Sequence, residues 1–525
     1  MKKYTIILIA LFACTGLLAQ GEMDAIRLSG SSLRGTARGQ AMGGAFGALG
    51  GDVTGIMINP AGLGLYRSSE LNFTMALNFA NTQTDWQNTI NKGNNIKFNF
   101  DNISYVGYYS TGNAGLPTLN FAFSWNRLKS FNRSYIASGR GMNSSLTDYI
   151  TAITNGYDGN QGVFVDDMIA DSRYEGYDPY RPRYGDPQIP WLSILGWNGW
   201  LINDDTDYTY SSILFPDEKV APRLEVNERG YIDSYDVSLG ANVQDKFYWG
   251  LTFSLTDISY RWDSRYDEEF KPRGGIGLDN YLETNGTGYQ VKLGAIWRPA
   301  DFLRFGVSYY SPTWYYLTDY YQGRAIAQYD IKDEWAKTPD HAYTRYRFNT
   351  PYNWIFSIAG IIGTKAIVSL DYEIKDYRGM KLMDNLGRPQ KIDNDYIEED
   401  FKVASTLRAG LEFRFTPQLS GRLGYSYVQN PYEKEFKNGW KEAMIIGTIP
   451  HYTIDGDAHH FTTGIGYRFT PQFYIDAAFI YRTQQNDLYY FPSVVGDDGN
   501  FIVQSTPASM TNRACKGLVT VGYKF

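Results

Sequence analysis

The chain has 525 residues, a formal net charge of −7, 16% aromatic side chains and 53 glycines. The acidic charge argues against nucleic acid as a partner. Beyond the N-terminal segment, no stretch has the roughly 18 consecutive apolar residues of a membrane-spanning helix. A composition rich in aromatic residues and glycine, without helical spans, is typical of a closed β-sheet, either soluble or in an outer membrane.

The first residues form an export signal. Two lysines precede the apolar run IILIALFA, and GLLAQ places a small residue before a cleavage site after Ala19. This pattern predicts a signal peptide at residues 1–19. The alternative is lipidation at Cys14, in LFAC. After export only Cys515 remains, which excludes an intramolecular disulfide and a zinc site built from thiols, so we expect neither a metal nor a cofactor.

Apolar and polar residues alternate with period 2 from about residue 70 onward. In TLNFAFSWN, for example, Phe121 and Phe123 fall on one face, and Asn120 and Ser124 fall on the other. Fourteen such segments predict fourteen strands, and bacterial single-chain barrels have even strand numbers. The segments are residues 70–81, 95–110, 117–137, 231–245, 247–263, 280–298, 302–320, 345–361, 365–378, 403–416, 418–430, 456–470, 472–486 and 504–525.

The connections between these segments alternate between short and long. VQDK, RPAD, IGTK and FTPQ, which occurs twice, are tight turns. The long connections include an insert at residues 138–230, the acidic stretch DSRYDEEFKPRGG, and a loop with the acidic run NDYIEED, which is interpreted as solvated. The alternation favours short periplasmic turns, long outer loops and periplasmic termini. Apolar faces then contact lipid, so Asn120, on the lumen face, is expected to tolerate a charge better than Phe121.

The chain ends in LVTVGYKF, which alternates up to an aromatic terminal residue. A terminal Phe525 on a final strand is the usual address for the barrel-assembly machinery. We therefore predict an all-β protein, a 14-stranded antiparallel transmembrane β-barrel. It is expected in the outer membrane, in contact with lipid and lipopolysaccharide.

Several stretches carry a resemblance to a known family. They are GTARGQAMGGAFGALGGDVTGIMINPAGLG, GTGYQVKLGAIWRPADFLRFGVSYYSPT, NTPYNWIFSIAG with SLDYEIKDY, TTGIGYRFTPQFYIDAAFIYR and the terminal GYKF. With these residues the chain resembles the FadL/TodX outer-membrane transport family, in the form common in Bacteroidetes. The resemblance implies an N-terminal plug at residues 20–65, folded inside a barrel formed by residues 66–525.

The resemblance also implies a gate in the plug. Asn59, Pro60 and Ala61 match the family's tripeptide at the turn between plug and first strand, and Gly62 follows them. The alternative is a purely structural turn. Relatives open a lateral gap through a kink in the third strand. Residues 118–138 contain no proline or mid-strand glycine that marks such a kink, which argues against a lateral route here.

The function implied by the resemblance is passive, affinity-driven uptake of hydrophobic small molecules, namely long-chain fatty acids or similar compounds. Outer loops in the family capture the substrate first. In the insert, IPWLSILGWNGWLIN crowds apolar residues together, and the alternatives to capture are a private core beneath the loop or contact with lipopolysaccharide. The expected capture residues are Trp191, Leu192, Leu195, Trp197 and Trp200.

Two other functions are open alternatives. Some relatives are described as haemin receptors, and DAHHF offers His459 and His460 as haem ligands. Neighbouring residues in a strand point to opposite faces, so only one of these histidines is expected to face the lumen. The second alternative is surface presentation of secreted proteins by the same fold. The sequence has no P-loop, no H-E-x-x-H motif and no serine–histidine pairing to nominate, so no enzyme is predicted.

Overall fold

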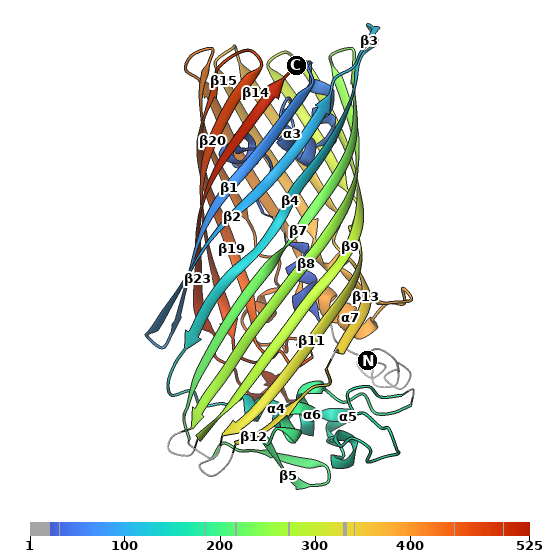
Figure 1. Ribbon diagram of the computed structural model, residues 1–525, viewed down its shortest axis with the longest axis vertical. Helices are drawn as coiled ribbons and strands as arrows, with labels where there is room; N and C mark the ends of the chain where they lie inside the picture. Colours follow the sequence, from blue (N-terminus) through green and yellow to red (C-terminus); the bar gives the residue numbers. More distant parts are fainter. Residues whose placement is uncertain are drawn as a thin grey trace.

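A computed structural model describes residues 21–30, 32–183, 185–215, 218–270, 274–328, 333–340, 342–445, 447–496 and 498–525. The expected signal peptide at residues 1–19 and the candidate lipidation site Cys14 lie outside these described residues. None of the described helices is long and apolar enough to cross a membrane. The architecture is instead dominated by long tilted strands (Figure 1).

Fourteen antiparallel wall strands form a closed barrel, because the first strand pairs with the last. The seventh and eighth wall strands are each broken at a proline, Pro312 and Pro351, which have no N–H to donate to the ladder. In chain order the wall consists of β1 (Glu70–Trp86), β2 (Thr89–Gly107), β4 (Leu116–Ser138), β7 (Val220–Val243), β8 (Phe247–Phe270), β9 (Gly274–Ala300), β10 (Leu303–Tyr310) with β11 (Trp314–Gln328), β13 (Ala342–Asn349) with β14 (Asn353–Ile362), β15 (Ala366–Asp376) with β16 (Lys381–Asp384), β17 (Val403–Arg414), β18 (Leu419–Val428), β19 (Tyr452–Arg468), β20 (Phe473–Tyr489) and β23 (Ala508–Lys524).

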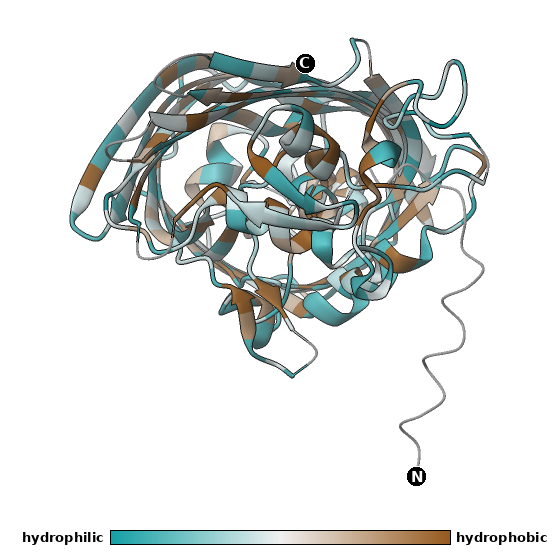
Figure 2. Cartoon of the chain, turned by 90° about the horizontal axis from the view of Figure 1, so that it is seen from below, coloured by the Kyte–Doolittle hydropathy of each residue, from teal (hydrophilic) through white to brown (hydrophobic). Residues whose placement is uncertain are grey.

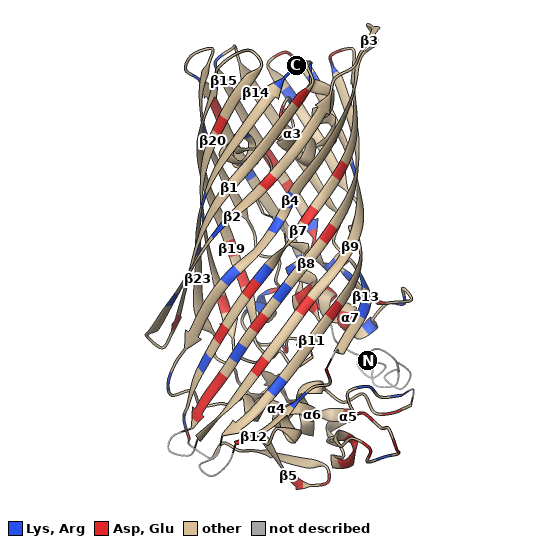
Figure 3. Ribbon diagram, viewed as in Figure 1, with Lys and Arg blue, Asp and Glu red and all other residues tan. Residues whose placement is uncertain are grey.

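Each predicted segment overlaps one wall strand, which confirms the fold class, but several strands are longer than predicted. β7 begins at Val220, so the connection before it covers residues 139–219 and not 138–230. β8 runs through the acidic stretch to Phe270 and is not a loop there. The alternation continues because charged side chains replace apolar ones on the outer face, where Arg261 and Arg265 pair with nearby aspartates. Figure 3 shows these rows of alternating charge on the lower wall.

The wall separates apolar from polar side chains on its two faces. In β4, Phe121 and Phe123 are 39% and 52% exposed on the outside, whereas Asn120 and Asn126 are fully buried on the lumen side. The outward residues form an apolar belt bordered by aromatic rings, such as the stacked Tyr105 and Phe525 at the short-turn end. A belt of this kind is the surface that an outer-membrane barrel presents to lipid.

Residues 21–65 lie inside the barrel (Figures 1 and 2). Gly21 contacts Met444 at the end with long connections, whereas the C-terminal Phe525 lies at the short-turn end. The prediction of two termini at the short-turn end is therefore wrong for the described N-terminal residues, because the plug runs along the lumen before β1 starts. The plug elements are α1 (Glu22–Ser29), α2 (Ala37–Ala41), α3 (Val53–Ile58) and the 3-10 helix η1 (Pro60–Leu65).

The long connections fold over one end of the barrel as a cap, which lies at the bottom of Figure 1. A short hairpin strand, β3 (Ser110–Asn113), extends from the opposite end. The cap elements are α4 (Leu146–Asn155), α5 (Tyr157–Asn160), η2 (Val165–Met168), α6 (Trp191–Asn198), β5 (Ile202–Thr206), β6 (Thr209–Ser212), β12 (Asp333–Lys337), η3 (Tyr377–Gly379), α7 (Lys391–Asp400), α8 (Lys434–Lys437), β21 (Val494–Val495) and β22 (Phe501–Val503).

Candidate functional site

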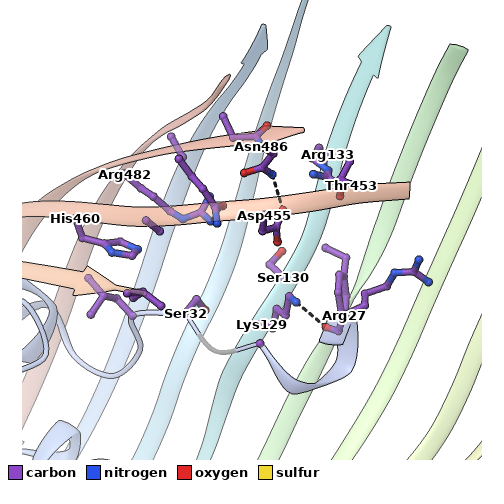
Figure 4. A pocket seen from close by; sticks show the side chains of 18 of the residues that line it. Arg27, Ser32, Lys129, Ser130, Arg133, Thr453, Asp455, His460, Arg482 and Asn486 are labelled. Carbon is purple, nitrogen blue, oxygen red and sulfur yellow. Dashed lines mark hydrogen bonds between the residues drawn. The ribbon is translucent and has the colours of Figure 1, made fainter. Parts of the chain in front are cut away.

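A cavity of about 440 Å³ lies in the lumen, between the plug and the wall (Figure 4). Met23 and Ile26 of α1 give it an apolar side, and Leu33 and Phe131 extend that surface. Cations outnumber anions on the remaining sides. The basic lining residues are Arg27, Arg127, Lys129, Arg133, Lys375, Arg482, Arg513 and Lys516, and the acidic ones are Asp101, Glu228, Glu373 and Asp455.

Only part of the positive charge is neutralised by neighbours. Five of the eight cations have an acidic partner, and these pairs are Arg27 with Asp24, Arg127 with Asp233, Arg133 with Glu228, Lys375 with Glu373 and Lys516 with Asp101. Lys129 donates instead to a neutral acceptor, the carbonyl oxygen of Arg27 at 2.7 Å. A cavity with an apolar wall and unbalanced cations suits a ligand that has an apolar body and an anionic end.

The wall is interrupted beside this cavity, between β2 and β4. These strands pair only from Asn102 with Asn126 to Gly107 with Phe121. By comparison, β7 and β8 pair along all of their 24 residues. Within the described chain, residues 89–100 of β2 therefore have ladder partners on one side only, in β1, and Asp101 is an extra residue where the register between β1 and β2 shifts.

The interruption follows from a bulge in β4. The register with β7 shifts between Arg127 and Lys129, which leaves one extra residue on β4. Even-numbered residues face the lumen before the bulge, and odd-numbered ones such as Phe131 and Tyr135 are buried after it. A bulge thus replaces the proline or glycine kink that the sequence lacks. The change of phase is visible in the sequence, and it is the signal that was missed.

The interrupted seam has the polar lining of the cavity on one side and the apolar belt on the other. On the lumen side, the cavity lining includes Asn99 and Asp101 from one edge and Ser130 from the other. On the outside, Phe98 and Phe100 are 55% and 45% exposed within the apolar belt. The cavity therefore reaches the wall where its backbone ladder is missing and where the outer surface faces lipid.

The predicted gate residues anchor the plug to the wall. Asn59 is buried and donates from Nδ2 to the carbonyl oxygens of Gly47 at 2.7 Å, Ala295 at 3.2 Å and Val307 at 3.3 Å. Its Oδ1 accepts from the Ala61 N–H at 3.1 Å, which starts η1. Asn59 thus lies between α3 and η1, and Pro60 and Ala61 are the first residues of η1, so the tripeptide does not lie directly before β1.

Close backbone approach at this point depends on wall glycines. A Cβ on Gly294 would lie 2.0 Å from the Asn59 Oδ1, and one on Gly250 would lie 2.2 Å from the Pro60 carbonyl carbon. Any side chain there would push the turn off the wall. Pro60, Ala61 and Gly62 are buried, so the turn is shielded from solvent.

Buried ion pairs hold a second part of the plug. Arg38 forms a bidentate salt bridge with Glu412 of β17, with nitrogen–oxygen distances of 2.8 and 2.9 Å. Arg422 of β18 contacts the same carboxylate at 2.7 Å and Asp476 of β20 at 2.5 Å. Asp371 also accepts from two plug N–H groups, those of Phe46 and Gly47. The short-turn end of the lumen is therefore filled by a firmly bound plug.

The predicted capture residues have mixed positions in α6 and just after it. Leu192 and Leu195 are buried in the cap, so they do not form the exposed surface that the sequence predicts. Trp191 packs between Tyr180 and Tyr321. The Trp197 indole donates to Asp204 at 3.3 Å, and Trp200 is 56% exposed. The helix is apolar on several sides because cap segments and β11 of the wall surround it.

The two candidate haem ligands lie on opposite faces of β19, as the strand geometry predicts. His459 points outward and contacts the Tyr425 hydroxyl at 2.9 Å. His460 is buried and lines the lumen cavity. The pair therefore does not converge on one iron. Among the described residues, no cluster of three or more histidine, cysteine or acidic side chains is placed to hold a metal ion.

A closed barrel with an apolar outer belt, a lumen cavity and an internal plug defines the class of plugged outer-membrane channels. Residues 276–509 match the family model described as outer membrane protein transport protein (OMPP1/FadL/TodX). This part of the chain is therefore similar to the FadL/TodX family. The matched residues start in β9, so the plug and the seam lie outside them.

Solved structures agree with this fold. A Pseudomonas aeruginosa FadL homologue aligns with a TM-score of 0.53 and 12% identity, over 94% of this chain and 99% of its own. The toluene transporter TodX of P. putida aligns with a TM-score of 0.51 and 13% identity, over the same shares. No curated protein matches the chain.

Proposed function

We propose that the protein takes up amphipathic hydrophobic molecules with an anionic end, of the long-chain fatty acid kind, by passive diffusion. The observation that carries this substrate class is the excess of lysine and arginine in the lumen cavity, opposite the apolar side chains of α1. A neutral aromatic hydrocarbon, the substrate class named for TodX, has no negative charge to pair with these cations. The family-level function, a channel for hydrophobic compounds, does not depend on this choice.

Transfer into the cavity is driven by affinity and needs no energy source. An alkyl chain gains about 25 cal/mol for each Å² removed from water, and Met23 and Ile26 offer an apolar contact surface. A carboxylate gains charge-assisted hydrogen bonds from side chains such as Lys129 and Arg482.

We place the exit at the seam between β2 and β4. The plug is clamped by buried ion pairs at the short-turn end, so a straight path along the lumen is blocked there. The cavity lining, in contrast, includes both edges of the seam, and the outer surface at that level is apolar. A ligand that moves sideways then enters lipid without crossing water.

Fixing the seam closed tests this exit. Asn95 and Asn132 exchange side-chain hydrogen bonds of 3.3 and 3.0 Å across it, so cysteines at both positions are within reach of a short bifunctional thiol reagent. In a Cys515→Ala background we expect Asn95→Cys/Asn132→Cys to lose fatty-acid uptake when cross-linked and to regain it when a cleavable linker is reduced. Ligand binding in detergent is expected to persist, because the cavity itself is unchanged.

The matched control is Asn227→Cys/Asp263→Cys, a directly paired position in the complete ladder of β7 and β8. Cross-linking there should leave uptake unchanged. Full uptake through a quantitatively cross-linked Asn95/Asn132 protein would place the exit elsewhere. A cavity that binds toluene and a fatty acid equally well would contradict the substrate class but not the channel function.

We also propose that Asn59 holds the plug in its closed position. In Asn59→Ala the carbonyl oxygens of Gly47, Ala295 and Val307 lose their shared donor, at a cost of about 1–3 kcal/mol for buried groups. The plug is expected to loosen, and small polar solutes to leak through liposome-reconstituted protein. Pro60→Ala keeps these contacts and is expected to leak far less. Heat-modifiable migration shows whether Asn59→Ala is folded. If the folded variant has unchanged leakage and uptake, the tripeptide is only a linker.

A further inference from the structure

A buried carboxylate lies at the inner end of the seam. Asp101 is the extra residue of β2 where the register with β1 shifts, and it directly precedes Asn102, where pairing with β4 begins. Its side chain is 4% exposed and lines the lumen cavity. Asp101 therefore lies at the point where β2 changes from a strand with two ladders to an edge held by one ladder.

Two neighbours outside β2 bind this carboxylate. Lys516 of β23 forms a salt bridge with Asp101, and Gln40 of α2 donates from Nε2 to the Asp101 Oδ2 at 3.3 Å. Lys516 also donates to the Gln40 Oε1 at 3.2 Å, so the three side chains contact one another. The helix α2 is held on the wall by the Ala37 N–H, which donates to the Thr520 Oγ1 at 2.7 Å. The seam edge is thus tied to a fixed plug helix and to a wall strand beyond β1.

Lys516 is also a cation that the cavity offers to a ligand. Its side chain is 20% exposed and lines the cavity together with Gln40 and Asp101. The acidic partners of the other paired cations in the lining lie on α1, β7 and β15, within the described chain. Only the Lys516 pair therefore joins a ligand-facing cation to the edge of the seam.

We infer that Asp101 occupies the place of the ligand's anionic end while the seam is closed, and that a bound carboxylate releases the seam edge. A ligand carboxylate on Lys516 competes with Asp101 for the same cation, and the two anions repel each other. An unpaired buried carboxylate is costly, so Asp101 moves toward water together with the strand edge that one ladder holds. This inference rests on the proposed anionic substrate and adds that its charged end opens the exit.

The competition links ligand affinity to the width of the seam. Binding energies are coupled reciprocally, so any change that weakens the contact between Asp101 and Lys516 also strengthens ligand binding. A neutral apolar molecule in the cavity does not compete for Lys516 and leaves Asp101 paired. The seam is therefore expected to open for an amphipathic acid and to stay closed around an uncharged molecule of the same length.

Spin labels on the two edges of the seam test this expectation. Labels at Asn95→Cys and Asn132→Cys, in the Cys515→Ala background, report the width of the seam by double electron–electron resonance in lipid nanodiscs. We expect saturating palmitate to lengthen the distance between the labels. Palmitic acid methyl ester has the same chain without the charge and should leave the distance unchanged. Equal lengthening by both compounds would overturn the inference.

Asp101→Asn removes the competing charge but keeps the shape of the side chain. We expect the labels to be further apart without ligand. The Kd of palmitate, measured by isothermal titration calorimetry, should fall about tenfold, because a tethered competitor acts at a millimolar or higher effective concentration. Lys516→Met should abolish the response of the labels to palmitate. The matched control is Glu228→Gln, which removes another buried acid of the cavity, one that pairs with Arg133 of β4 and not with β2. It should keep the wild-type distance and response.

The outcomes separate this inference from the proposed function. Wild-type distances and affinity in Asp101→Asn would overturn the inference, as would an equal change of distance in Glu228→Gln. Palmitate that binds the wild type without moving the labels overturns the inference and leaves the substrate class intact, whereas a wild type that binds no palmitate overturns both. Heat-modifiable migration shows that each variant has a folded barrel, and the comparison of palmitate with its ester needs no change at Asp101 or Lys516.

Discussion

Glu412→Ala is expected to free the plug from the wall while leaving the barrel folded. The Glu412 carboxylate is buried and contacts Arg38 of the plug and Arg422 of the wall at 2.8 and 2.7 Å. Removing it leaves the buried Arg422 guanidinium with Asp476 as its acidic partner, and leaves the largely buried Arg38 with Asp52 and Asp476 as the remaining nearby acids. Breaking a buried ion pair by deleting one partner costs roughly 3–5 kcal/mol. Small-solute leakage in liposomes and protease cleavage within residues 30–65 report the loss.

The control for this variant is an exposed ion pair between the segment that joins the plug to β1 and the turn between β7 and β8. Arg67 and Asp245 are 2.6 Å apart, but their side chains are 60% and 46% exposed. Asp245→Ala is expected to cost at most about 1 kcal/mol and to leave the plug in place. Equal leakage from both variants would mean that the buried network does not hold the plug.

Phe121→Arg is expected to destabilise the barrel in lipid by roughly 2–4 kcal/mol, because it places a charge on the lipid face of β4. Phe121 lies within the apolar belt, next to Phe123 and Tyr105. Refolding yield into vesicles, measured across a urea series by heat-modifiable migration, gives the change in free energy. A variant as stable as the wild type would show that this row does not face lipid.

The lumen-side control for Phe121→Arg is Asn78→Arg, and not the neighbouring Asn120. Asn120 does face the lumen, but it is fully buried and donates to the carbonyl oxygens of Leu63 and Tyr66. We therefore no longer expect Asn120 to tolerate a charge, because Asn120→Arg should displace η1. Asn78 lines the polar cavity, so Asn78→Arg should cost much less than Phe121→Arg. Similar losses for Asn78→Arg and Phe121→Arg would contradict the assignment of faces.

The wall strands were predictable because their signal is local. Period-2 alternation repeats in each segment and needs no knowledge of neighbours. The same rule underestimates the lengths of β7 and β8, because the row of outward apolar side chains ends where the membrane ends. Beyond that level, paired charges such as Arg265 and Asp267 continue the strand on its outer face. The predicted strands are therefore too short where the outer face changes from lipid-facing to charged.

The parts that were not predictable depend on contacts between distant segments. Asp400 ends the run NDYIEED, which looks solvated, and Asp393 directly precedes that run, yet both are buried on α7, which packs on a plug helix more than 360 residues earlier in the chain. Leu192 and Leu195 look exposed in a loop, but the cap surrounds them. The lumen cavity combines residues from α1, β4, β19 and β20, and no spacing along the sequence brings these together.

The pairing of β1 with β23 has a consequence for assembly. Glu70 lies opposite Lys524, and the Phe525 N–H donates to the Ser69 carbonyl oxygen at 3.0 Å. The two edges of the sheet thus meet only when the last residues of the chain are in position, and until then both edges lack partners. The plug precedes β1 and is synthesised before any strand. This topology lets the plug dock on an open, curved sheet and be enclosed at closure, so that no helix has to thread through a finished pore.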